Sequence, residues 1–542
     1  MKLSALLAGV PDAVVIPAGL ASADGELGEI RDDSRLVEPG DLFVAVPGTA
    51  ADGNGFIADA IARGARGVVM DAAAPVAAAL GGFDGIRVTV PRVRQALGLI
   101  AANRFAAADA VALMAVTGTN GKTTTTYLNE AILRAAGRRP GVIGTVSYRV
   151  SSGGVSAKEG PAGWPGASAP LFSRPAPLTT PGALALHALF AEMRDAGATD
   201  VVLEASSHAL DQGRLEGCRF RVAGLTNLTQ DHLDYHRTMD AYFEAKAILF
   251  ERLLDERDGV AVLPVDRPEG RAMRGRVRAP ARVLGFAARP TAGADVVAER
   301  VDAASDGMRL RVATPLGALE LTSSLVGTFN LENILLAVGM AIGRGLERDA
   351  IVAGIAGLTG VPGRLERVTN DRGVLCVIDY AHTPDALERA LAAVRPLVAP
   401  GGRLVTVFGC GGDRDRTKRP LMGEAAARDS DLAIVTSDNP RTEDPASIVA
   451  MVMDGARRAG VPELDPEALA RATRGFCAIA DRRSAIRRAV ASTRPGDVLV
   501  IAGKGHEDYQ IVGLERLHFD DREEAAVAFV AAGPAAPAED AP

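Results

Sequence analysis

Ala115-Val-Thr-Gly-Thr-Asn-Gly-Lys-Thr-Thr-Thr125 is the stretch of sequence that decides the fold class. Residues 111–116, which lead into it, are apolar and mostly suited to a short buried strand. Residues 123–136, which follow, carry apolar side chains at helical spacing. Gly118 and Gly121 therefore lie in a predicted turn between a strand and a helix, where backbone N–H groups can surround an anion.

The side chains of this turn indicate which anion it holds. Lys122 adds a positive charge, and Thr123 offers a hydroxyl to a bound Mg²⁺ at the start of the helix. The full Walker pattern fails, because Val116 stands where its first glycine belongs. We predict a nucleoside triphosphate site, with a chance glycine turn as the alternative. The predicted ATP-binding residues of the loop are Gly118, Thr119, Asn120, Gly121, Lys122, Thr123 and Thr124.

Length and composition are typical of a multidomain globular protein. The chain has 542 residues, of which 48% are hydrophobic and 23% charged. No apolar run approaches the roughly 20 residues of a membrane span, so no membrane insertion is expected. Pro11 and Asp12 interrupt the only apolar stretch that could serve as a signal peptide, which predicts a cytoplasmic protein.

Charge and cysteine content argue against several further classes of protein. The formal net charge is −7 and no dense Lys/Arg block occurs, so we expect no nucleic-acid partner and favour a phosphorylated small molecule. The four cysteines lack CxxC spacing, which argues against a disulfide framework or a zinc site. We expect them to be buried small hydrophobic residues.

Three α/β regions separate by their patterns. Residues 1–107 predict a small N-terminal α/β domain, and 108–360 a central P-loop ATPase-like domain with a mainly parallel sheet. Residues 361–542 predict a doubly wound, Rossmann-like C-terminal domain. The Ser/Gly/Ala/Pro-rich segment 151–177 is expected to be a flexible surface loop, and the Ala/Pro/Glu-rich tail 531–542 to be disordered.

Polar motifs follow the predicted strands of the third region directly. Ligands of open α/β sheets bind at the carboxyl ends of the strands, so these motifs are candidate site residues. The four strands are 374–378, 404–408, 432–436 and 498–502.

The central region shows the same arrangement beside the phosphate loop. Predicted strand 200–203 ends in Glu204, and strand 222–225 is followed by a segment containing His232. A hard cation that bridges phosphates needs one or two such ligands, so Glu204, His232 and the Thr123 hydroxyl are a predicted Mg²⁺ set. A structural histidine is the alternative, but five of the seven histidines fall in strand-end motifs. Lys246, on a predicted amphipathic helix, is by itself expected to be a solvated lysine.

Taken together, the motifs resemble the Mur ligases in order and spacing over nearly the whole chain. They are Gly118-Thr-Asn-Gly-Lys-Thr123, Glu204-Ala-Ser-Ser-His208, Asn227-Leu-Thr-Gln-Asp-His-Leu-Asp-Tyr-His236, Lys246, Asn330-Leu-Glu-Asn333, Gly363-Arg-Leu-Glu366, Asp379-Tyr-Ala-His-Thr-Pro384, Gly409-Cys-Gly-Gly-Asp-Arg-Asp415, Asp438-Asn-Pro-Arg441 and Gly503-Lys-Gly-His-Glu507.

The resemblance implies an ATP-dependent, amide-forming ligase. In the family ATP phosphorylates a substrate carboxylate, and an incoming amine attacks the acyl phosphate to give an amide, ADP and phosphate. By resemblance Lys246 is carbamylated to an N6-carboxylysine, which supplies a carboxylate for a second Mg²⁺. The implied catalytic residues are Lys122, Glu204, His232 and Lys246, and the implied metal ligands are Thr123, Glu204, His232 and Lys246.

Further residues match family positions that hold the two nucleotides. For ATP these are Asn330, Asn333, Arg364, Asp379 and His382, although both asparagines could equally be helix caps. For the UDP-muramoyl dipeptide they are Ser34, Thr179, Thr180, Ser206, Gln212 and Arg214, with a loop-capping role as the alternative for Ser34. The segment Thr49-Ala50-Ala51 departs from the His-Gln-Ala of some relatives, which leaves the uracil contacts there open.

The third region carries the signal for the amino acid that is added. Asp438-Asn439-Pro440-Arg441 resembles the motif of members that add meso-diaminopimelate to UDP-N-acetylmuramoyl-L-alanyl-D-glutamate in peptidoglycan precursor synthesis. A guanidinium can pair with the distal carboxylate that lysine lacks. Arg414, Gly503 and Glu507 match the remaining contacts. The alternatives are a ligase adding L-lysine or D-Ala-D-Ala, and a nucleotide-binding regulator without turnover. A monomer is expected.

Overall fold

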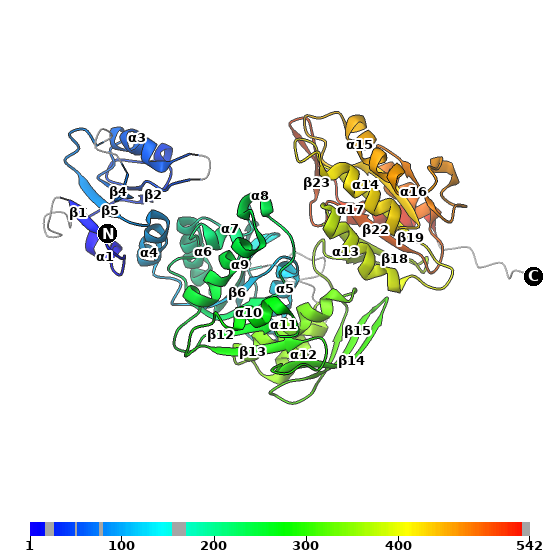
Figure 1. Ribbon diagram of the computed structural model, residues 1–542, viewed down its shortest axis with the longest axis horizontal. Coiled ribbons are helices and arrows are strands. Elements are labelled where there is room, and N and C mark those ends of the chain that lie inside the picture. The colour runs from blue at the N-terminus through cyan, green and yellow to red at the C-terminus, as the bar shows by residue number, and fades with distance from the viewer. Residues whose placement is uncertain (17–25, 49–50, 75–79, 154–169, 534–542) are drawn as a thin grey trace, which may run out of the picture. The chain divides into compact units, whose positions relative to one another are not determined.

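The computed structural model describes residues 1–16, 26–48, 51–74, 80–153 and 170–533 (Figure 1). Thr49 and Ala50, most of the predicted 151–177 loop and most of the predicted disordered tail lie outside the described residues. In their described parts both predictions were wrong, because β9 Phe172–Pro175 pairs with β8 Ser147–Val150 and α17 Asp521–Ala532 continues to Ala532. Among the described helices, none combines the length and apolar character that a membrane crossing requires. The chain divides into two compact units, the first comprising Met1–Glu299, Arg311–Glu320 and Glu332–Gly357, the second Arg300–Leu310, Leu321–Leu331 and Leu358–Pro542.

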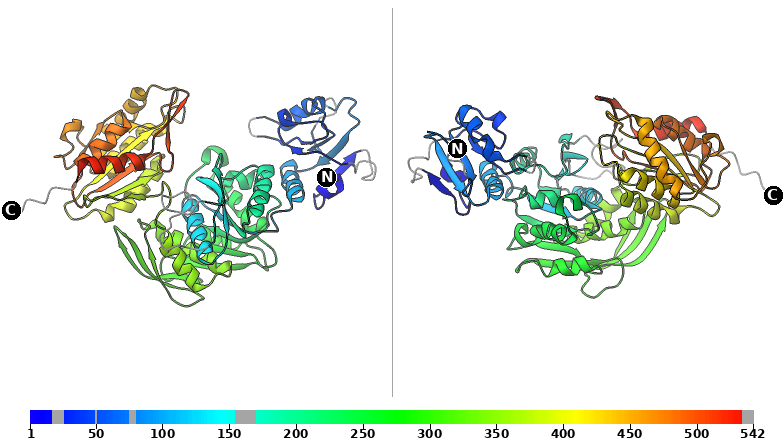
Figure 2. Two further views of the ribbon diagram at one scale, coloured as in Figure 1. Left: turned by 180° about the vertical axis from the view of Figure 1, so that it is seen from behind. Right: turned by 45° about the horizontal axis from the view of Figure 1, so that its top comes forward.

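The fold is α/β, as predicted, with one main sheet in each of the three predicted regions (Figures 1 and 2). The first has the order β1-β5-β4-β3-β2, parallel except for β1. Because successive strand side chains face opposite sides, Val44 packs with α1 and α4 while Phe43 packs with α3. The elements are α1 Leu3–Leu6, β1 Val14–Ile16, β2 Ile30–Arg31, η1 Ser34–Leu36, β3 Leu42–Val44, η2 Gly53–Phe56, α3 Ile57–Ala62, β4 Gly67–Asp71, β5 Ile86–Val90 and α4 Val93–Phe105.

The central sheet has the order β16-β15-β14-β13-β12-β11-β6-β10-β7-β8-β9. Its middle, from β13 to β7, is parallel. Helices α6 and α10 contribute Phe190 and Met273 to the core on one face, whereas Gly224 of β11 faces Met340 of α11 on the other. The strands are β6 Ala112–Thr117, β7 Pro140–Ile143, β8 Ser147–Val150, β9 Phe172–Pro175, β10 Asp200–Glu204, β11 Phe220–Leu225, β12 Val260–Pro264, β13 Arg282–Ala287, β14 Val296–Ala304, β15 Gly307–Ala313 and β16 Leu319–Ser323. The helices are α5 Lys122–Ala135, α6 Ala183–Asp195, α7 Ser207–Asp211, α8 Leu233–His236, α9 Met239–Ile248, η3 Leu249–Leu253, α10 Pro268–Arg274, α11 Phe329–Gly343 and α12 Arg348–Gly357.

The third sheet has the order β17-β18-β22-β19-β20-β21 and is doubly wound, as predicted. Val500 of β22 packs in a core with α13, α14 and α15, whereas its neighbour Ile501 packs with α16 and α17. A separate antiparallel hairpin, β23–β24, follows β22. The strands are β17 Glu366–Val368, β18 Leu375–Asp379, β19 Leu404–Cys410, β20 Leu432–Ser437, β21 Gly475–Ala478, β22 Val498–Ala502, β23 Tyr509–Val512 and β24 Glu515–His518. The helices are α13 Pro384–Val394, η4 Arg395–Leu397, α14 Lys418–Asp429, α15 Pro445–Arg458, η5 Pro466–Ala468, α16 Arg482–Ser492 and α17 Asp521–Ala532.

The cysteines match their prediction. Cys218, Cys376, Cys410 and Cys477 are free and buried. Burial in apolar surroundings raises the pKa of all four thiols, to about 12 for Cys410 and Cys477.

Candidate active site

The glycine-rich loop joins β6 to α5, as the sequence predicted. Gly118 and Gly121 have φ of 141° and 89°, which side chains rarely adopt. A Cβ at Gly118 would lie 1.8 Å from Thr226 Oγ1, so the close approach of the two strand ends also requires glycine. The Asn120 N–H donates to Asn227 Oδ1 at 3.0 Å, and Thr119 N–H donates to the Asn227 carbonyl at 2.9 Å. The loop is therefore held against the segment that follows β11.

Two lysine side chains converge on one carbonyl of this loop. Lys122 Nζ donates to the Gly118 carbonyl at 3.1 Å and to the Thr119 carbonyl at 2.9 Å. Lys246 Nζ donates to the same Gly118 carbonyl at 3.0 Å and lies 4.3 Å from the centre of the Tyr242 ring. The expectation that Lys246 is solvated was wrong, because its side chain is 1% exposed. Helical periodicity gave no indication that the phosphate loop covers this face of α9.

Burial and repulsion change the acid–base state of Lys246. Burial lowers its pKa well below the usual value for lysine, and the positive charge of Lys122 lowers it further, against a smaller opposing effect of Asp231. This shift favours the neutral amine, which is a nucleophile.

Glu204 lies at the end of β10, beside the phosphate loop. Its register partner is Val116 of the neighbouring β6, two residues before Gly118. The carboxylate is buried and accepts hydrogen bonds from Thr145, through the backbone N–H at 3.0 Å and the hydroxyl at 3.1 Å. These contacts fix its orientation at the sheet edge predicted for the site.

His232 follows β11, on the other side of β6. Its φ of 53° is unusual for a residue other than glycine, and Asp231 lies 3.5 Å from its ring. Burial lowers the pKa of the imidazole against the opposing effect of Asp231, and the positive charges of Lys122 and Lys246 lower it further. The ring is therefore held neutral, the form in which histidine binds metals. It belongs to a ring cluster with His208, Tyr235, His236 and Tyr242.

The asparagines of α11 differ in their surroundings. A Cβ added to Gly121 would lie only 2.2 Å from Asn333 Oδ1, so the Asn333 side chain packs directly against the phosphate loop. Asn330 is buried, and its amide donates to the Val326 carbonyl at 2.7 Å.

In the second unit, Arg364, Asp379 and His382 gather around Tyr380. The Arg364 guanidinium lies 5.3 Å from the centre of that ring, and the His382 ring centre lies 4.6 Å from it. Asp379 accepts from the N–H groups of Leu365 and Ala381, and burial raises its pKa. This cluster presents a cation, a carboxylate and two rings at the end of β18.

Residues predicted to hold the muramoyl dipeptide form one hydrogen-bonded group. The Thr180 hydroxyl donates to the Glu204 carbonyl at 2.7 Å and to Ser206 Oγ at 3.2 Å. Arg214 donates to the Thr180 carbonyl at 2.9 Å and to Gln212 Oε1 at 2.6 Å. Two other residues predicted for this substrate are Thr179, which hydrogen-bonds Thr145 at 3.2 Å, and Ser34, which is buried at the start of η1 in the N-terminal region.

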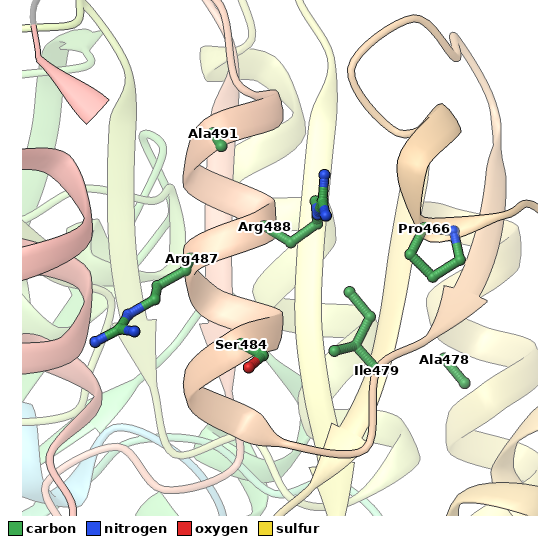
Figure 3. A pocket seen from close by; sticks show the side chains of 7 residues that line it. All are labelled: Pro466, Ala478, Ile479, Ser484, Arg487, Arg488 and Ala491. Atoms are coloured by element: carbon green, nitrogen blue, oxygen red, sulfur yellow. The ribbon is translucent and has the colours of Figure 1, made fainter. Parts of the chain in front are cut away.

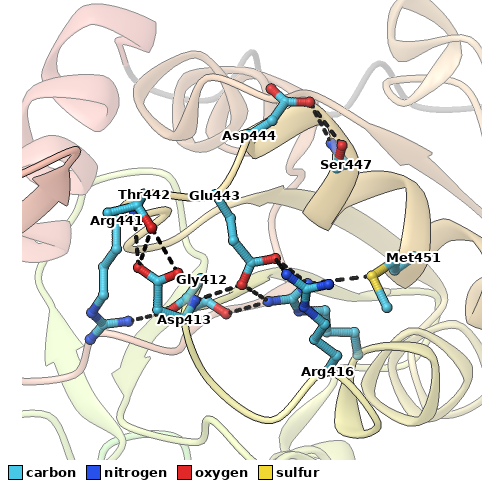
Figure 4. Close-up of polar contacts among 11 residues, drawn as sticks. Gly412, Asp413, Arg416, Arg441, Thr442, Glu443, Asp444, Ser447 and Met451 are labelled. Carbon is cyan, nitrogen blue, oxygen red and sulfur yellow. Dashed lines mark hydrogen bonds and ion pairs between the residues drawn. The ribbon is translucent and has the colours of Figure 1, made fainter.

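The Asp438–Arg441 segment forms a polar network at the end of β20, not an isolated turn. Asn439 Nδ2 donates to Glu507 Oε2 at 2.9 Å, although burial raises the pKa of that carboxyl group. Arg441 donates to the Gly412 carbonyl at 2.8 Å (Figure 4). Arg414 follows Asp413 and donates to its carbonyl at 3.3 Å, and Gly503, with φ of 117°, lies beside Asp438. The predicted amino-acid-binding residues thus meet at the carboxyl ends of β19, β20 and β22.

Sequence reasoning missed Lys504, which is completely buried in this network. Its Nζ donates to Asn439 Oδ1 at 3.0 Å and lies 3.3 Å from Asp438 Oδ1. A lysine between two glycines at a strand end was the available signal. A separate shallow pocket of about 460 Å³ between β21, η5 and α16 contains none of the predicted site residues (Figure 3).

Comparison with known proteins identifies the family. Three family models match: the Mur ligase family catalytic domain over residues 27–105, the Mur ligase middle domain over 116–341, and the Mur ligase glutamate ligase domain over 363–505. Two relatives, from Geobacter metallireducens and Geobacter sulfurreducens, are each 46% identical and named UDP-N-acetylmuramoyl-L-alanyl-D-glutamate–2,6-diaminopimelate ligase. The matches cover 92% and 96% of this chain, and 93% and 98% of the relatives.

Solved structures agree with this assignment. A structure of a UDP-N-acetylmuramoyl-L-alanyl-D-glutamate–2,6-diaminopimelate ligase is 33% identical, with a TM-score of 0.67, and covers 98% of this chain and 99% of its own. MurF ligase from Thermotoga maritima in complex with ADP, 18% identical with a TM-score of 0.56, shares the fold over 92% of this chain and 96% of its own. The chain therefore belongs to the Mur ligase family.

Proposed function

We propose that this chain is the ATP-dependent ligase that joins meso-diaminopimelate to UDP-N-acetylmuramoyl-L-alanyl-D-glutamate in the cytoplasmic synthesis of peptidoglycan precursors. The observation that carries the proposal is the network at the end of β20, in which Asn439 is hydrogen-bonded to Glu507 beside Arg441. A zwitterionic amino acid with a distal carboxylate needs both a carboxylate and a guanidinium for its recognition. The names of the relatives at 46% identity agree with this substrate.

The first chemical step is transfer of the ATP γ-phosphate to the substrate's terminal carboxylate, which leaves ADP and an acyl phosphate. One anion attacks another, so the main requirement is neutralisation of negative charge. The loop N–H groups and Lys122 lie at the start of α5, where the helix dipole adds to their effect. The amine of the amino acid then attacks the acyl carbon, phosphate leaves, and one proton is released.

The donor groups around the loop fit Mg²⁺. Mg²⁺, when bound, would offset the negative charge of the ATP phosphates. Glu204, His232 and the buried Thr123 hydroxyl supply a carboxylate, a neutral imidazole and an alcohol. In the described part of the chain, no three His, Cys, Asp or Glu side chains gather into a metal-binding group. A second cation would therefore need a further anionic ligand.

Lys246 can provide that ligand as a carbamate. Its neutral amine can attack the carbon of CO₂, forming an N–C bond and releasing one proton to leave a carboxylate on the side chain. This change replaces a positive charge beside Lys122 by a negative one, so it removes the repulsion between two ammonium groups that share the Gly118 carbonyl. The burial and the location of Lys246 support this modification.

Phosphate release by the purified protein tests the proposal. The assay contains ATP, Mg²⁺ and UDP-N-acetylmuramoyl-L-alanyl-D-glutamate, with meso-diaminopimelate, L-lysine or D-Ala-D-Ala as the third substrate. We expect rapid release with meso-diaminopimelate and little with the other two. Preference for either of the others would replace the proposed substrate, and absence of release with all three would indicate a nucleotide-binding protein without this activity.

A further inference from the structure

Lys504 is a buried cation whose polar contacts lie in the network at the end of β20, and its Nζ also lies 5.9 Å from the centre of the Phe519 ring. Its Nζ donates to Asn439 Oδ1 at 3.0 Å and to the Tyr509 carbonyl at 2.7 Å, and lies 3.3 Å from Asp438 Oδ1. An ammonium group has three donors in a compact arrangement, and here three oxygens surround it. Arginine, with a planar fork of donors, could not reproduce this geometry.

Lys504 determines which way the Asn439 amide faces. Asn439 Oδ1 accepts from Lys504 Nζ and also from the Ile511 backbone N–H at 3.0 Å. Two donors fix the oxygen on that side, so the amide nitrogen must face Glu507 and donate to it at 2.9 Å. Reversal of the amide would place its oxygen against a carboxylate and leave the two donors without an acceptor.

Strand β23 holds the backbone of the same segment. The Gln510 amide donates to the Asp438 carbonyl at 2.6 Å. Arg441 N–H donates to the Ile511 carbonyl at 3.0 Å, and Gly513 N–H donates to the Arg441 carbonyl at 2.8 Å. The side chains and backbone of β23 thus contact the segment from its first residue to its last.

These contacts hold Arg441 in a conformation that it would not adopt freely. Its φ is 52°, in the left-handed region that arginine seldom occupies, and backbone hydrogen bonds on both sides of the residue secure it there. The guanidinium is then directed to the Gly411–Asp413 loop, where it donates to the Gly412 carbonyl (Figure 4). A strained residue that its surroundings keep in one conformation is typical of a binding site.

We propose that Lys504, Gln510, Ile511 and Gly513 form a clamp that positions Asn439, Arg441 and Glu507 for the incoming amino acid. The clamp is a positioning element and does not itself contact the substrate. Its predicted role in selecting an amino acid with a distal carboxylate rests on the proposed function. Its structural role, which is to keep the segment 438–441 in one conformation, does not.

Two variants remove parts of the clamp with matched controls. Lys504→Met removes a buried cation, and Arg403→Met removes another. Arg403 pairs with Asp497 at 2.7 Å, just before the first residues of β19 and β22 and so at the opposite ends of these strands. Gly513→Ala places a side chain at φ of 60° in open space, and Gly460→Ala does the same at φ of 69° after α15. Each control makes the same kind of change away from the clamp.

The kinetic measurement compares KM for the amino acid with KM for ATP. We expect Lys504→Met to raise the KM for meso-diaminopimelate at least about tenfold, and Gly513→Ala to raise it about three- to tenfold, with KM for ATP nearly unchanged. The two controls should lower thermal stability without changing the ratio of the two KM values. Equal changes in both KM values, or none in the clamp variants, would overturn the proposed role.

Hydrogen exchange tests the clamp without any substrate. In Lys504→Met, peptides covering 438–443 and 508–514 should exchange faster than in the wild type, whereas β19 should keep its protection. Unchanged exchange in both peptides would show that no clamp exists. If exchange changes but the wild type does not use meso-diaminopimelate, the proposed function fails and the clamp stands. The KM comparison is then made with the amino acid that the wild type does use.

Discussion

Replacing Lys246 should abolish turnover without weakening the fold, which is an uncommon result for a residue that is 1% exposed. Lys246 Nζ and Lys122 Nζ each lie about 3 Å from the Gly118 oxygen, so the two nitrogens are no more than about 6 Å apart. At an effective dielectric constant of about 20, two positive charges at that distance repel by roughly 3 kcal/mol. In protein that carries no carbamate, removing this ammonium group relieves the repulsion and the larger penalty of burying the charge.

Lys246→Met preserves most of the side-chain volume and removes the amine. We expect its midpoint of thermal unfolding to be no lower than that of wild-type protein freed of CO₂, in which Lys246 is not carbamylated. Its phosphate release should fall about a thousandfold or more below that of wild-type protein supplied with CO₂, since no carbamate can form. Lys246→Ala leaves space where the carbamate would lie, so formate or acetate should restore part of its activity. The same acids should have no effect on Lys246→Met. Wild-type rates in Lys246→Ala would refute the reasoning, as would equal responses of the two variants to added acid.

Three further predictions concern other parts of the molecule. Lys122→Ala should reduce turnover by several orders of magnitude with an unchanged circular dichroism spectrum, because the positive charge beside the phosphates is lost; near-normal turnover would contradict its role. Arg441→Ala should raise KM for meso-diaminopimelate by roughly 30-fold or more with little change in KM for ATP, and an unchanged preference over L-lysine would contradict the pairing. Burial raises the pKa of Glu366 to about 7. The free energy of unfolding that this carboxyl group contributes is therefore complete below its unfolded pKa near 4.5 and is lost as pH rises through 7. The total loss is on the order of 3 kcal/mol. Chemical denaturation from pH 4 to 8 should show this decline in the wild type and a flatter curve in Glu366→Gln.

Much of the fold could be predicted because its signals are local. The strands ending at Glu204, Asp379 and Ser437 are mainly short apolar runs, and each ends in or is followed directly by polar residues. Parallel strands bring such residues to one sheet edge, so the sequence was sufficient to group them. The glycine-rich loop could also be predicted, because Gly118 and Gly121 both adopt positive φ angles that other residues rarely adopt.

Other elements were missed for identifiable reasons. Strands β14 and β15 are joined by Ser305 and Asp306, and the dipeptide Asp306-Gly307 is a typical hairpin signal. The strands were missed because the exposed second half of β14 carries little hydrophobic contrast. The hairpin β23–β24 has mixed polar residues that face neither core, so its alternation carries little hydrophobic contrast. Its importance comes from contacts to Arg441, 70 residues earlier in the chain, which local patterns do not encode.

The burial of the two lysines also could not be read from the sequence. Lys246 follows a helical pattern whose polar face would ordinarily meet water, and only the tertiary position of the phosphate loop covers it. Lys504 resembles any lysine in a glycine-rich turn until its three oxygen partners are seen together. Whether a charged side chain can be buried depends on the groups that pair with it, and these groups come from distant parts of the chain.

The reactivity of the four buried thiols can be used to follow local and global unfolding of the native protein. Thiol reagents attack the thiolate, and burial both blocks access and keeps these groups protonated. Alkylation of the folded chain therefore has to wait for local or global unfolding. Cys218 belongs to the first unit, and Cys376, Cys410 and Cys477 to the second. Pulsed labelling read by mass spectrometry can thus time the opening of each unit separately, with no engineered probe and no change to the sequence.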